Sequence, residues 1–212
     1  MSDTTRAKII LYGAGGHAAV VEAAIHQNTG MQCAAIIDDG VARGTLVVYQ
    51  EVSGSGADLP VLLAGGMQDI HIAIGNNATR ARLASEVCSL GFKLLTVRHP
   101  ASVVDSQAEI GAGSFLAVGS IIGTRTEIGE GCIINTAATV DHDCIIGAFT
   151  HICPGVHLAG EVRVGERTMI GTGAVVIPQI TIGDDCIIGA GAVVIRDIAS
   201  GTTVVGVPAR AI

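Results

Sequence analysis

Aromatic side chains are almost missing from this chain of 212 residues. There is no tryptophan, and tyrosine and phenylalanine together make up only 2% of the residues, whereas glycine occurs 29 times. Ordinary globular cores take much of their buried area from large rings. The composition therefore indicates an interior that is too narrow for such rings over much of the chain.

Long apolar runs and clusters of basic residues are missing as well. Hydrophobic residues make up 49% of the chain, yet it contains no stretch of about 18 apolar residues of the kind that spans a bilayer. Residues 1–8 lack the layout of a secretory signal peptide. A formal net charge of -7, without any cluster of Lys and Arg, argues against a nucleic-acid partner. We therefore expect a soluble, cytoplasmic protein.

The six cysteines are scattered along the chain without any CxxC pair. This spacing argues against a structural zinc site and against a thioredoxin-like redox motif. Free cysteine usually behaves as a small, buried apolar residue. We expect packed, reduced thiols and no metal cofactor.

A strict six-residue period fills the second half of the chain. Every sixth residue from Val104 to Val194 is Val, Ile or Leu, and the residue two places earlier is small in most repeats. Six matches neither the helical period of 3.6 nor the alternation of a strand. If each hexapeptide makes one short strand and one corner, three of them form a coil of a triangular solenoid. The aliphatic side chains then point inward, and we expect the small residues to make the tight bends.

The first hundred residues follow another pattern, in which apolar runs alternate with helical segments. The candidate strands are residues 8–12, 34–37, 70–74 and 93–97. The candidate helices are residues 20–26 and 78–90. Such alternation implies a parallel sheet with helical crossovers. We expect a small α/β domain over residues 1–99 and the solenoid over residues 100–212.

The glycine-rich turn GAGGHA follows the first candidate strand. Gly13, Gly15 and Ala18 fit the permissive form of the dinucleotide fingerprint, in which the backbone approaches a pyrophosphate at a helix N-terminus. Asp38, about twenty positions further on, would suit a ribose hydroxyl. A tight turn that only packs a helix on a strand explains the same residues equally well. Because the domain is too short for both halves of a Rossmann fold, a nucleotide is a better ligand than NAD.

His142 is the leading candidate for a general base. It lies two places after the inward position Val140, and Asp141 and Asp143 flank it. Histidine is the natural base near neutral pH, and either carboxylate could hold the ring and raise its basicity. The alternative is an exposed histidine without a role. Cys144 would be needed for an acyl-enzyme, but its place in the row of small residues favours packing.

The hexapeptide pattern resembles the left-handed parallel β-helix of the hexapeptide-repeat acyltransferases. With a GAGGHA-type half-Rossmann (βαβαβ) domain in front, the whole chain resembles the bacterial acetyltransferases that N-acetylate nucleotide-linked 4-amino-4,6-dideoxysugars, and the related sialic-acid O-acetyltransferases. The resemblance implies transfer of an acetyl group from acetyl-CoA to the 4-amino group of a UDP- or GDP-linked sugar in glycan biosynthesis. It also implies direct attack with a histidine base, and a homotrimer with active sites between subunits.

The same resemblance assigns roles to individual residues. The segment that begins NTAATVDHD matches the family's active-site segment, so His142 would be the base, Asp143 its supporting acid and His151 a contact of acetyl-CoA. The family more often has Glu at the place of Asp143. The positions that match the CoA channel are Gly160, Thr172 and Ala190. The positions that match the sugar-nucleotide site are Gly15, Gly16, His17, Asp38, Asp39 and Gly75.

Two other functions remain open on the sequence alone. One is O-acetylation of a sialic-acid hydroxyl, for which the same His142 would serve. The other is a catalytically silent solenoid that binds NAD or a nucleotide as a sensor or scaffold. The intact Asp-His-Asp segment around His142 argues against the second function.

Overall fold

The computed structural model describes residues 6–212, and the chain divides into two compact units, Met1–Pro100 and Ala101–Ile212. Residues 1–5, which belong to the segment without a signal-peptide layout, lie outside the described residues. No helix in the described part of the chain is both long and apolar enough to cross a membrane.

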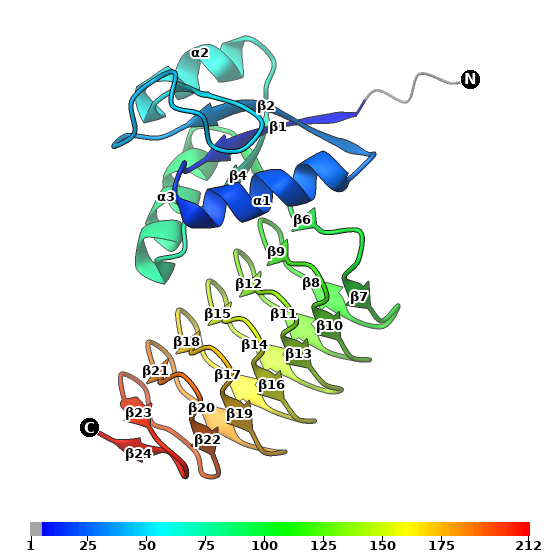
Figure 1. Ribbon diagram of the computed structural model, residues 1–212, viewed down its shortest axis with the longest axis vertical. Coiled ribbons are helices and arrows are strands. Elements are labelled where there is room, and N and C mark those ends of the chain that lie inside the picture. Colours follow the sequence, from blue (N-terminus) through cyan, green and yellow to red (C-terminus); the bar gives the residue numbers. More distant parts are fainter. Residues whose placement is uncertain (1–5) are drawn as a thin grey trace. The chain divides into compact units, whose positions relative to one another are not determined.

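The first unit contains a parallel sheet of five strands in the order β3-β2-β1-β4-β5 (Figure 1). Its strands are β1 (Ala7–Tyr12), β2 (Met31–Ile37), β3 (Val52–Gly54), β4 (Asp69–Ile72) and β5 (Lys93–Leu94). The central strand β1 contains Ile9, Ile10 and Leu11, none of which has any exposed surface. Such a continuous apolar run is typical of a parallel strand that is covered on both faces.

Helices connect these strands, and some of them differ from the sequence-based expectation. The helices are α1 (Gly16–Gln27), the 3-10 turn η1 (Gly56–Asp58), α2 (Leu59–Ala64) and α3 (Asn77–Ser89). Helix α1 begins four residues earlier than expected, because the glycine-rich turn already forms its first turn. Helix α3 begins after Asn76, whose side chain accepts a hydrogen bond from the Thr79 N–H as an N-cap.

Several other elements of the first unit were not expected or were wrongly bounded. Strand β3 and helix α2 had no counterpart in the sequence analysis, and the single strand expected over residues 93–97 is two short strands, β5 and β6 (Val97–Arg98). The sheet therefore has two strands more than the three of the βαβαβ pattern, although its parallel, half-Rossmann character is confirmed.

The second unit is a left-handed parallel β-helix with three faces, as the hexapeptide pattern predicts. What we call the β7 face consists of β7 (Val103–Val104), β10 (Ile121–Ile122), β13 (Thr139–Val140), β16 (His157–Leu158), β19 (Val175–Val176) and β22 (Val193–Val194). The β8 face consists of β8 (Glu109–Ile110), β11 (Glu127–Ile128), β14 (Ile145–Ile146), β17 (Arg163–Val164) and β20 (Thr181–Ile182). The β9 face contains β9 (Phe115–Leu116), β12 (Ile133–Ile134), β15 (His151–Ile152), β18 (Met169–Ile170), β21 (Ile187–Ile188), β23 (Thr203–Val205) and the antiparallel β24 (Arg210–Ala211).

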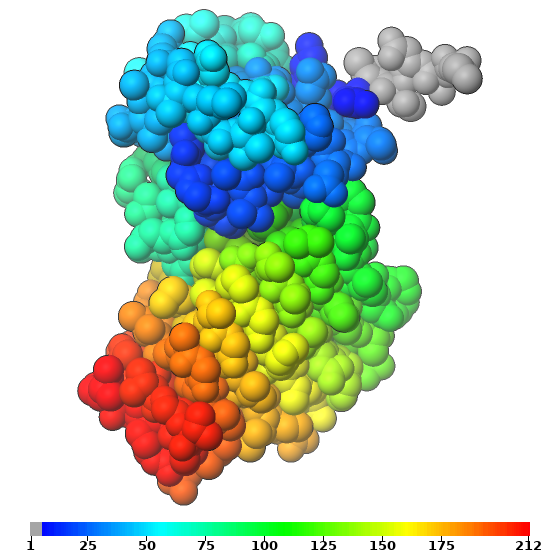
Figure 2. Space-filling view, in the orientation of Figure 1, coloured from blue at the N-terminus to red at the C-terminus, as the bar shows by residue number. Residues whose placement is uncertain are grey.

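Neighbouring strands on one face come from consecutive coils. The register pairs Ile121 with Thr139 and Ile122 with Val140, so that residues three hexapeptides apart stack on each other. Figure 2 shows the coils of this unit as bands of successive colour that lie directly against one another. This stacking brings residues together that are 18 positions apart in the sequence.

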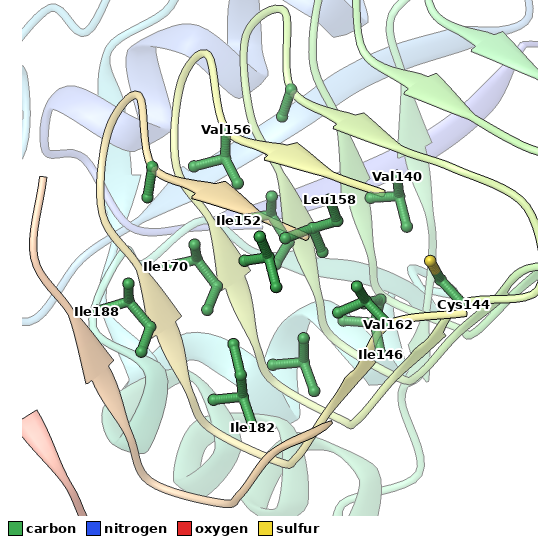
Figure 3. Packing of buried hydrophobic residues seen from close by; sticks show 14 of the residues in the cluster. Val140, Cys144, Ile146, Ile152, Val156, Leu158, Val162, Ile170, Ile182 and Ile188 are labelled. Carbon is green, nitrogen blue, oxygen red and sulfur yellow. The ribbon is translucent and has the colours of Figure 1, made fainter. Parts of the chain in front are cut away.

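The interior of the β-helix holds the aliphatic residue of each repeat. From Leu116 to Val194 these side chains are at most 3% exposed. Figure 3 shows seven of them inside the coils, directed toward one another: Val140, Ile146, Ile152, Leu158, Ile170, Ile182 and Ile188. Val104 and Ile110, at the first coil, are only partly buried. The small residues two places earlier also lie inside, as Cys132 and Ala138 show with no exposed surface.

The corners are made by a different residue from the one expected. Every sixth residue from Gly113 to Gly191 has a positive φ, and many of these residues are not glycine, for example Arg125 (φ 54) and Asp143 (φ 58). The small residues were expected to make the bends, but they fill the interior, and the left-handed residue that precedes each of them turns the chain. Its side chain projects outward, so a large polar residue can occupy the position at a modest backbone cost.

Candidate active site

His142 lies at the corner between β13 and β14, and its side chain is about half exposed (47%). Its Nδ1 lies 2.7 Å from Oδ2 of Asp143, whereas Asp141 accepts the backbone N–H of His142 at 2.8 Å. Asp143 therefore holds the ring, and Asp141 organises the backbone. In the neutral ring Nδ1–H donates to the carboxylate, which leaves the lone pair of Nε2 as the basic site.

Arg125 binds both oxygens of Asp143 from the preceding coil. Its Nε donates to Oδ1 at 2.6 Å and its Nη2 donates to Oδ2 at 2.7 Å. These contacts, with that of His142, lower the pKa of Asp143 to about 2. The hydrogen bond to Asp143 raises the pKa of His142, while the charge of Arg125 acts in the opposite direction. Arg125 was not predicted from the sequence, in which its signal was the 18-residue spacing to Asp143.

Glycines leave space for His142 from the coils on both sides. A Cβ on Gly160, one coil later, would lie 2.5 Å from both Cε1 and Nε2 of His142. A Cβ on Gly123, one coil earlier, would lie 2.8 Å from the backbone N of His142. The ring thus lies directly against the Gly160 backbone with Nε2 beside it. The structure brings His142, Asp143 and Gly160 together as one cluster.

Two hollows flank this corner. On the β7 face a hollow of about 320 Å³ is lined by Asp141, Leu158 and Ala159 among others. On the β8 face a hollow of about 540 Å³ is lined by Asp143, Glu161, Arg163, Gln179 and Thr181. The first has a largely apolar floor and the second is polar, so His142 separates two chemically different surfaces.

His151 lies elsewhere on the β-helix, in β15 of the β9 face, so that β14 separates it from His142. The amide Nδ2 of Asn135 lies 3.0 Å from its Nε2, while Oδ1 of Asn135 accepts the Thr136 N–H at 2.8 Å. This second contact orients the amide so that its nitrogen faces the ring. The Asn135 nitrogen then donates to Nε2, and His151 carries its proton on Nδ1.

Thr172 and Ala190 are exposed and lie one coil apart, at the corner between the β9 and β7 faces. The N–H of Gly191 donates to the carbonyl of Thr172 at 2.8 Å, which ties these two coils together at that corner. The structure therefore distributes the four expected CoA contacts over two corners and one face.

In the first unit, the expected substrate residues gather at the carboxyl edge of the sheet. The glycine-rich turn follows β1, Asp38 follows β2 and Gly75 comes shortly after β4. Because ligands of open parallel sheets bind outside these strand ends, the placement suits a nucleotide. The crevice between β1 and β4 is the point where the strand order changes direction.

The glycines near this sheet edge differ in whether the fold requires glycine at their position. Gly13 has φ 125, and a Cβ there would lie 2.7 Å from the carbonyl oxygen of Ala73, so packing and conformation both require glycine. Gly15, Gly16 and Gly75 have no atom within 4 Å of an added Cβ. Their small size leaves open space at the sheet edge that the fold itself does not fill.

The two aspartates after β2 organise the surrounding loops. Asp38 accepts backbone N–H groups of Ala14, Gly40 and Val41 at 2.8–2.9 Å. Asp39 accepts the hydroxyl of Tyr12 at 2.6 Å and the N–H of Gly56 at 2.8 Å, contacts that lower its pKa. Asp39 is nevertheless exposed, as a ligand contact must be.

His17 lies in the first turn of α1 and is partly buried. Tyr12, which the sequence analysis did not select, is 5% exposed at the end of β1 and joins this strand to the loop after β2. Its only signal in the sequence was its position directly before the glycine-rich turn.

Cys144 is a packing residue. Its side chain has no exposed surface, its Sγ donates to the carbonyl of Ala159 at 3.2 Å, and burial raises its pKa to about 11. A thiol held neutral in the interior cannot serve as an acyl-accepting nucleophile. Residues 6–212 also contain no group of three or more His, Cys, Asp or Glu side chains placed to hold a metal ion.

Two protein families match separate parts of the chain. Residues 8–87 match the PglD N-terminal domain, and residues 161–196 match the bacterial transferase hexapeptide family. The GDP-perosamine N-acetyltransferase of Escherichia coli O157:H7 is 33% identical over 158 residues, which cover 72% of this chain and 70% of that protein.

Solved structures resemble both units together. PerB from Caulobacter crescentus, solved with CoA and GDP-perosamine, has a TM-score of 0.92 and 40% identity over 97% of each chain. The acetyltransferase domain of PglB from Neisseria gonorrhoeae has a TM-score of 0.91 and 39% identity, over 98% of this chain and 100% of that one. That domain has also been solved with acetyl coenzyme A. With this fold and these relatives, the chain belongs to the hexapeptide-repeat N-acetyltransferases of nucleotide-linked amino sugars and is an acetyltransferase.

Proposed function

We propose that this enzyme transfers the acetyl group of acetyl-CoA to the 4-amino group of a GDP-linked 4-amino-4,6-dideoxysugar, with His142 as the general base. The observation that carries the proposal is the arrangement of His142, with Asp143 on Nδ1 and Nε2 beside the Gly160 backbone. GDP is the favoured nucleotide because PerB, similar over nearly the whole chain, was solved with GDP-perosamine.

His142 accepts one proton in this reaction. The acceptor nitrogen forms a bond to the thioester carbonyl carbon, and its excess proton passes to Nε2 of His142. The bond from this carbon to sulfur then breaks, and the departing sulfur takes the proton back, so that the base is restored. Asp143 stabilises the imidazolium that exists between these steps. The proposal needs no acyl-enzyme, which agrees with the burial of Cys144.

The residues proposed to hold acetyl-CoA fit such a ligand. His151 is partly buried in β15 and lies 3.0 Å from the Asn135 amide, and the buried Gly160 leaves space for the His142 ring. Thr172 and Ala190 offer small, exposed side chains on neighbouring coils. Acetyl-CoA supplies an activated acyl group and a good leaving group, and these four residues orient it.

The first unit would bind the sugar nucleotide at the carboxyl edge of its sheet. The open space at Gly15, Gly16 and Gly75 would admit the pyrophosphate, which the N-terminus of α1 attracts. His17 in the first turn of α1 would donate to a phosphate oxygen. Asp38 and Asp39 would accept hydrogen bonds from ribose or base. Residues 1–99 are thus the proposed substrate domain, and residues 100–212 the catalytic domain.

We further propose a homotrimer in the cytoplasm. His142 lies at the corner between the β7 and β8 faces, whereas His151 lies on the β9 face. We therefore propose that the His142 of one copy and the His151 of another serve the same active site. Three copies whose β-helices pack side by side would form three such sites. The cytoplasmic location follows from the two substrates, which are both made inside the cell.

A binding screen coupled to a transfer assay tests this function. Thermal stability is measured with acetyl-CoA, GDP- and UDP-linked 4-amino-4,6-dideoxysugars, CMP-sialic acid, free sialic acid and NAD, and free thiol is then measured for each ligand that binds. We expect acetyl-CoA and the GDP-linked sugar to raise the melting temperature and to release thiol together. Thiol release with sialic acid would instead identify an O-acetyltransferase, and stabilisation by NAD alone would identify a scaffold.

A further inference from the structure

Both oxygens of Asp143 are bound by Arg125, and one of them also binds the candidate base. Nη2 of Arg125 and Nδ1 of His142 share Oδ2 of Asp143, each at 2.7 Å, while Nε of Arg125 takes Oδ1. A guanidinium can bind a carboxylate through two parallel bonds, which fixes its plane as well as its position. The orientation of Asp143 therefore depends on Arg125.

We propose that Arg125 is a positioning residue, which holds the Asp143 carboxylate in the plane that points Nε2 of His142 along the Gly160 backbone. This inference rests on the proposed role of His142. Arg125 acts through Asp143 and touches neither substrate nor reacting atoms.

The backbone of the β-helix sets up this arrangement. Arg125 and Asp143 both occupy left-handed corner positions, with φ of 54° and 58°. The Asp143 N–H donates to the carbonyl of Thr124 at 3.0 Å, which fastens the two corners to each other. Their side chains leave the corner in the same direction, one coil apart. The guanidinium and the carboxylate therefore meet directly as an ion pair.

Charges on neighbouring coils determine what Arg125 does to the ring. Asp141 and Asp143 lie on the same corner as His142, and both raise its pKa, whereas Arg125 on the preceding coil lowers it. Glu161 on the following coil lines the polar hollow together with Asp143 and Arg163, and it accepts a hydrogen bond from Gln179. Loss of the Arg125 charge should therefore leave His142 more basic and more often protonated at neutral pH.

The same β-helix contains a matched control pair. Nε and Nη2 of Arg167 bind the two oxygens of Asp185 at 2.9 and 2.8 Å, again one coil apart, at left-handed positions with φ of 54° and 53°. The third nitrogen of this fork donates to Glu166 rather than sharing a carboxylate with a histidine. If Arg125 only stabilised the β-helix, the Arg167–Asp185 pair would have the same role, and substitutions of the two arginines would have the same effects.

The test compares Arg125→Gln, Arg125→Lys and Arg167→Gln with the parent enzyme, and includes His142→Asn. Activity is measured as kcat, as KM for each substrate and as the pH profile of kcat/KM, while NMR follows the titration of the His142 ring. For Arg125→Gln we expect kcat at pH 7 to fall about tenfold with both KM values nearly unchanged. Because the Arg125 charge lowers the pKa of His142, the acid limb of this variant and its NMR titration should move upward.

The two other variants separate charge from geometry. Arg125→Lys keeps the charge but cannot bind both oxygens in one plane, so we expect the pH profile of the parent and a lower kcat. Arg167→Gln should lower the melting temperature about as much as Arg125→Gln and leave kcat and the pH profile unchanged. An equal effect of Arg167→Gln on the profile, or no effect of Arg125→Gln on kcat and titration, would overturn the inference.

Failure of the proposed function gives a different result. If His142→Asn keeps full activity, His142 is not the base. The NMR titration still decides whether Arg125 controls the ring, because it does not depend on turnover. An unchanged His142 titration in Arg125→Gln would then overturn the inference, and an upward shift would support it.

Discussion

The two units of this enzyme combine fold and function in different ways. In the β-helix, the period sets each inward position, and the candidate base His142 and the positioning residue Arg125 occupy outward corners, where they do not disturb the core. In the α/β unit, the glycine-rich turn after β1 both packs against the rest of the fold and forms part of the candidate site. Gly13 must be glycine for packing, and Gly15, two residues later, leaves open space. Function is therefore easier to alter without loss of stability in the β-helix.

The largest expected effect lies at His142. His142→Asn removes the base, and we expect kcat to fall by about 10² to 10⁴-fold, because general-base catalysis contributes that much. The melting temperature should stay close to that of the parent, since the side chain is half exposed at a corner. Steady-state kinetics and thermal unfolding check both expectations.

His26→Asn serves as the control. His26 stacks on Tyr49 in the α/β unit, with ring centroids 3.9 Å apart, and lies outside the candidate site. We expect its loss to leave kcat within about twofold of the parent value, as is usual for surface changes away from the chemistry. A comparable loss of kcat in both variants would show that the histidine effect is not specific to the corner.

Two neighbouring isoleucines of β21 test which residue of a β-helix strand points inward and which points outward. Ile188 has no exposed surface and Ile187 is 44% exposed, although both belong to the same short strand. Ile188→Ala should lower the free energy of unfolding by about 2–5 kcal/mol, because it leaves a cavity. Ile187→Ala should cost less than about 1 kcal/mol. Denaturant titration measures both, and equal costs would contradict the assigned register.

Two glycines of the turn separate packing from ligand binding. Gly13→Ala places a Cβ 2.7 Å from Ala73 O at φ 125, and we expect it to cost roughly 3 kcal/mol of stability. Gly16→Ala meets no atom within 4 Å and should leave stability unchanged or slightly higher. If a pyrophosphate binds there, KM for the sugar nucleotide rises and KM for acetyl-CoA does not. An unchanged KM for both substrates would remove Gly16 from the substrate site.

A further predicted effect depends on pH and belongs to the α/β unit. His71 is 1% exposed, and burial lowers its pKa to about 4 in the folded state. The unfolded chain binds a proton at higher pH than the folded one, so this contribution to stability is present above pH 6.5 and is lost as the pH falls toward 4. We expect a loss of roughly 2–3 kcal/mol over that window. Denaturant titration between pH 4 and pH 7 measures it, and an equally steep loss in His71→Gln would exclude His71 as the cause.

Much of the β-helix could be predicted from the sequence, because one inward side chain per hexapeptide is a strict packing requirement. The buried row from Leu116 to Val194 therefore lies where the period predicts it. The left-handed corners could not be predicted, since a residue such as Arg125 has no intrinsic preference for a positive φ. The stacking of coils imposes that conformation.

The α/β unit was harder to predict. Strand β3 has three residues, includes Gly54 and lies beside β2 at the end of the strand order, so it is too short to show a period of its own. Among the site residues, His142 and Asp143 are neighbours in sequence and were found together. Arg125 was missed, because its contact to Asp143 spans a full coil. A contact between residues 18 positions apart can be recognised in the sequence only when the outward residues of successive coils are aligned with one another.

A single-turnover experiment tests the central claim most directly. Excess enzyme is mixed with acetyl-CoA and the GDP-linked 4-amino-4,6-dideoxysugar, and NMR identifies the product while free thiol is counted, with the parent enzyme and with His142→Asn. The account predicts one amide and one thiol for each sugar consumed by the parent, and a much slower appearance of both with His142→Asn. An ester product, or an amide formed at the parent rate without His142, would contradict it.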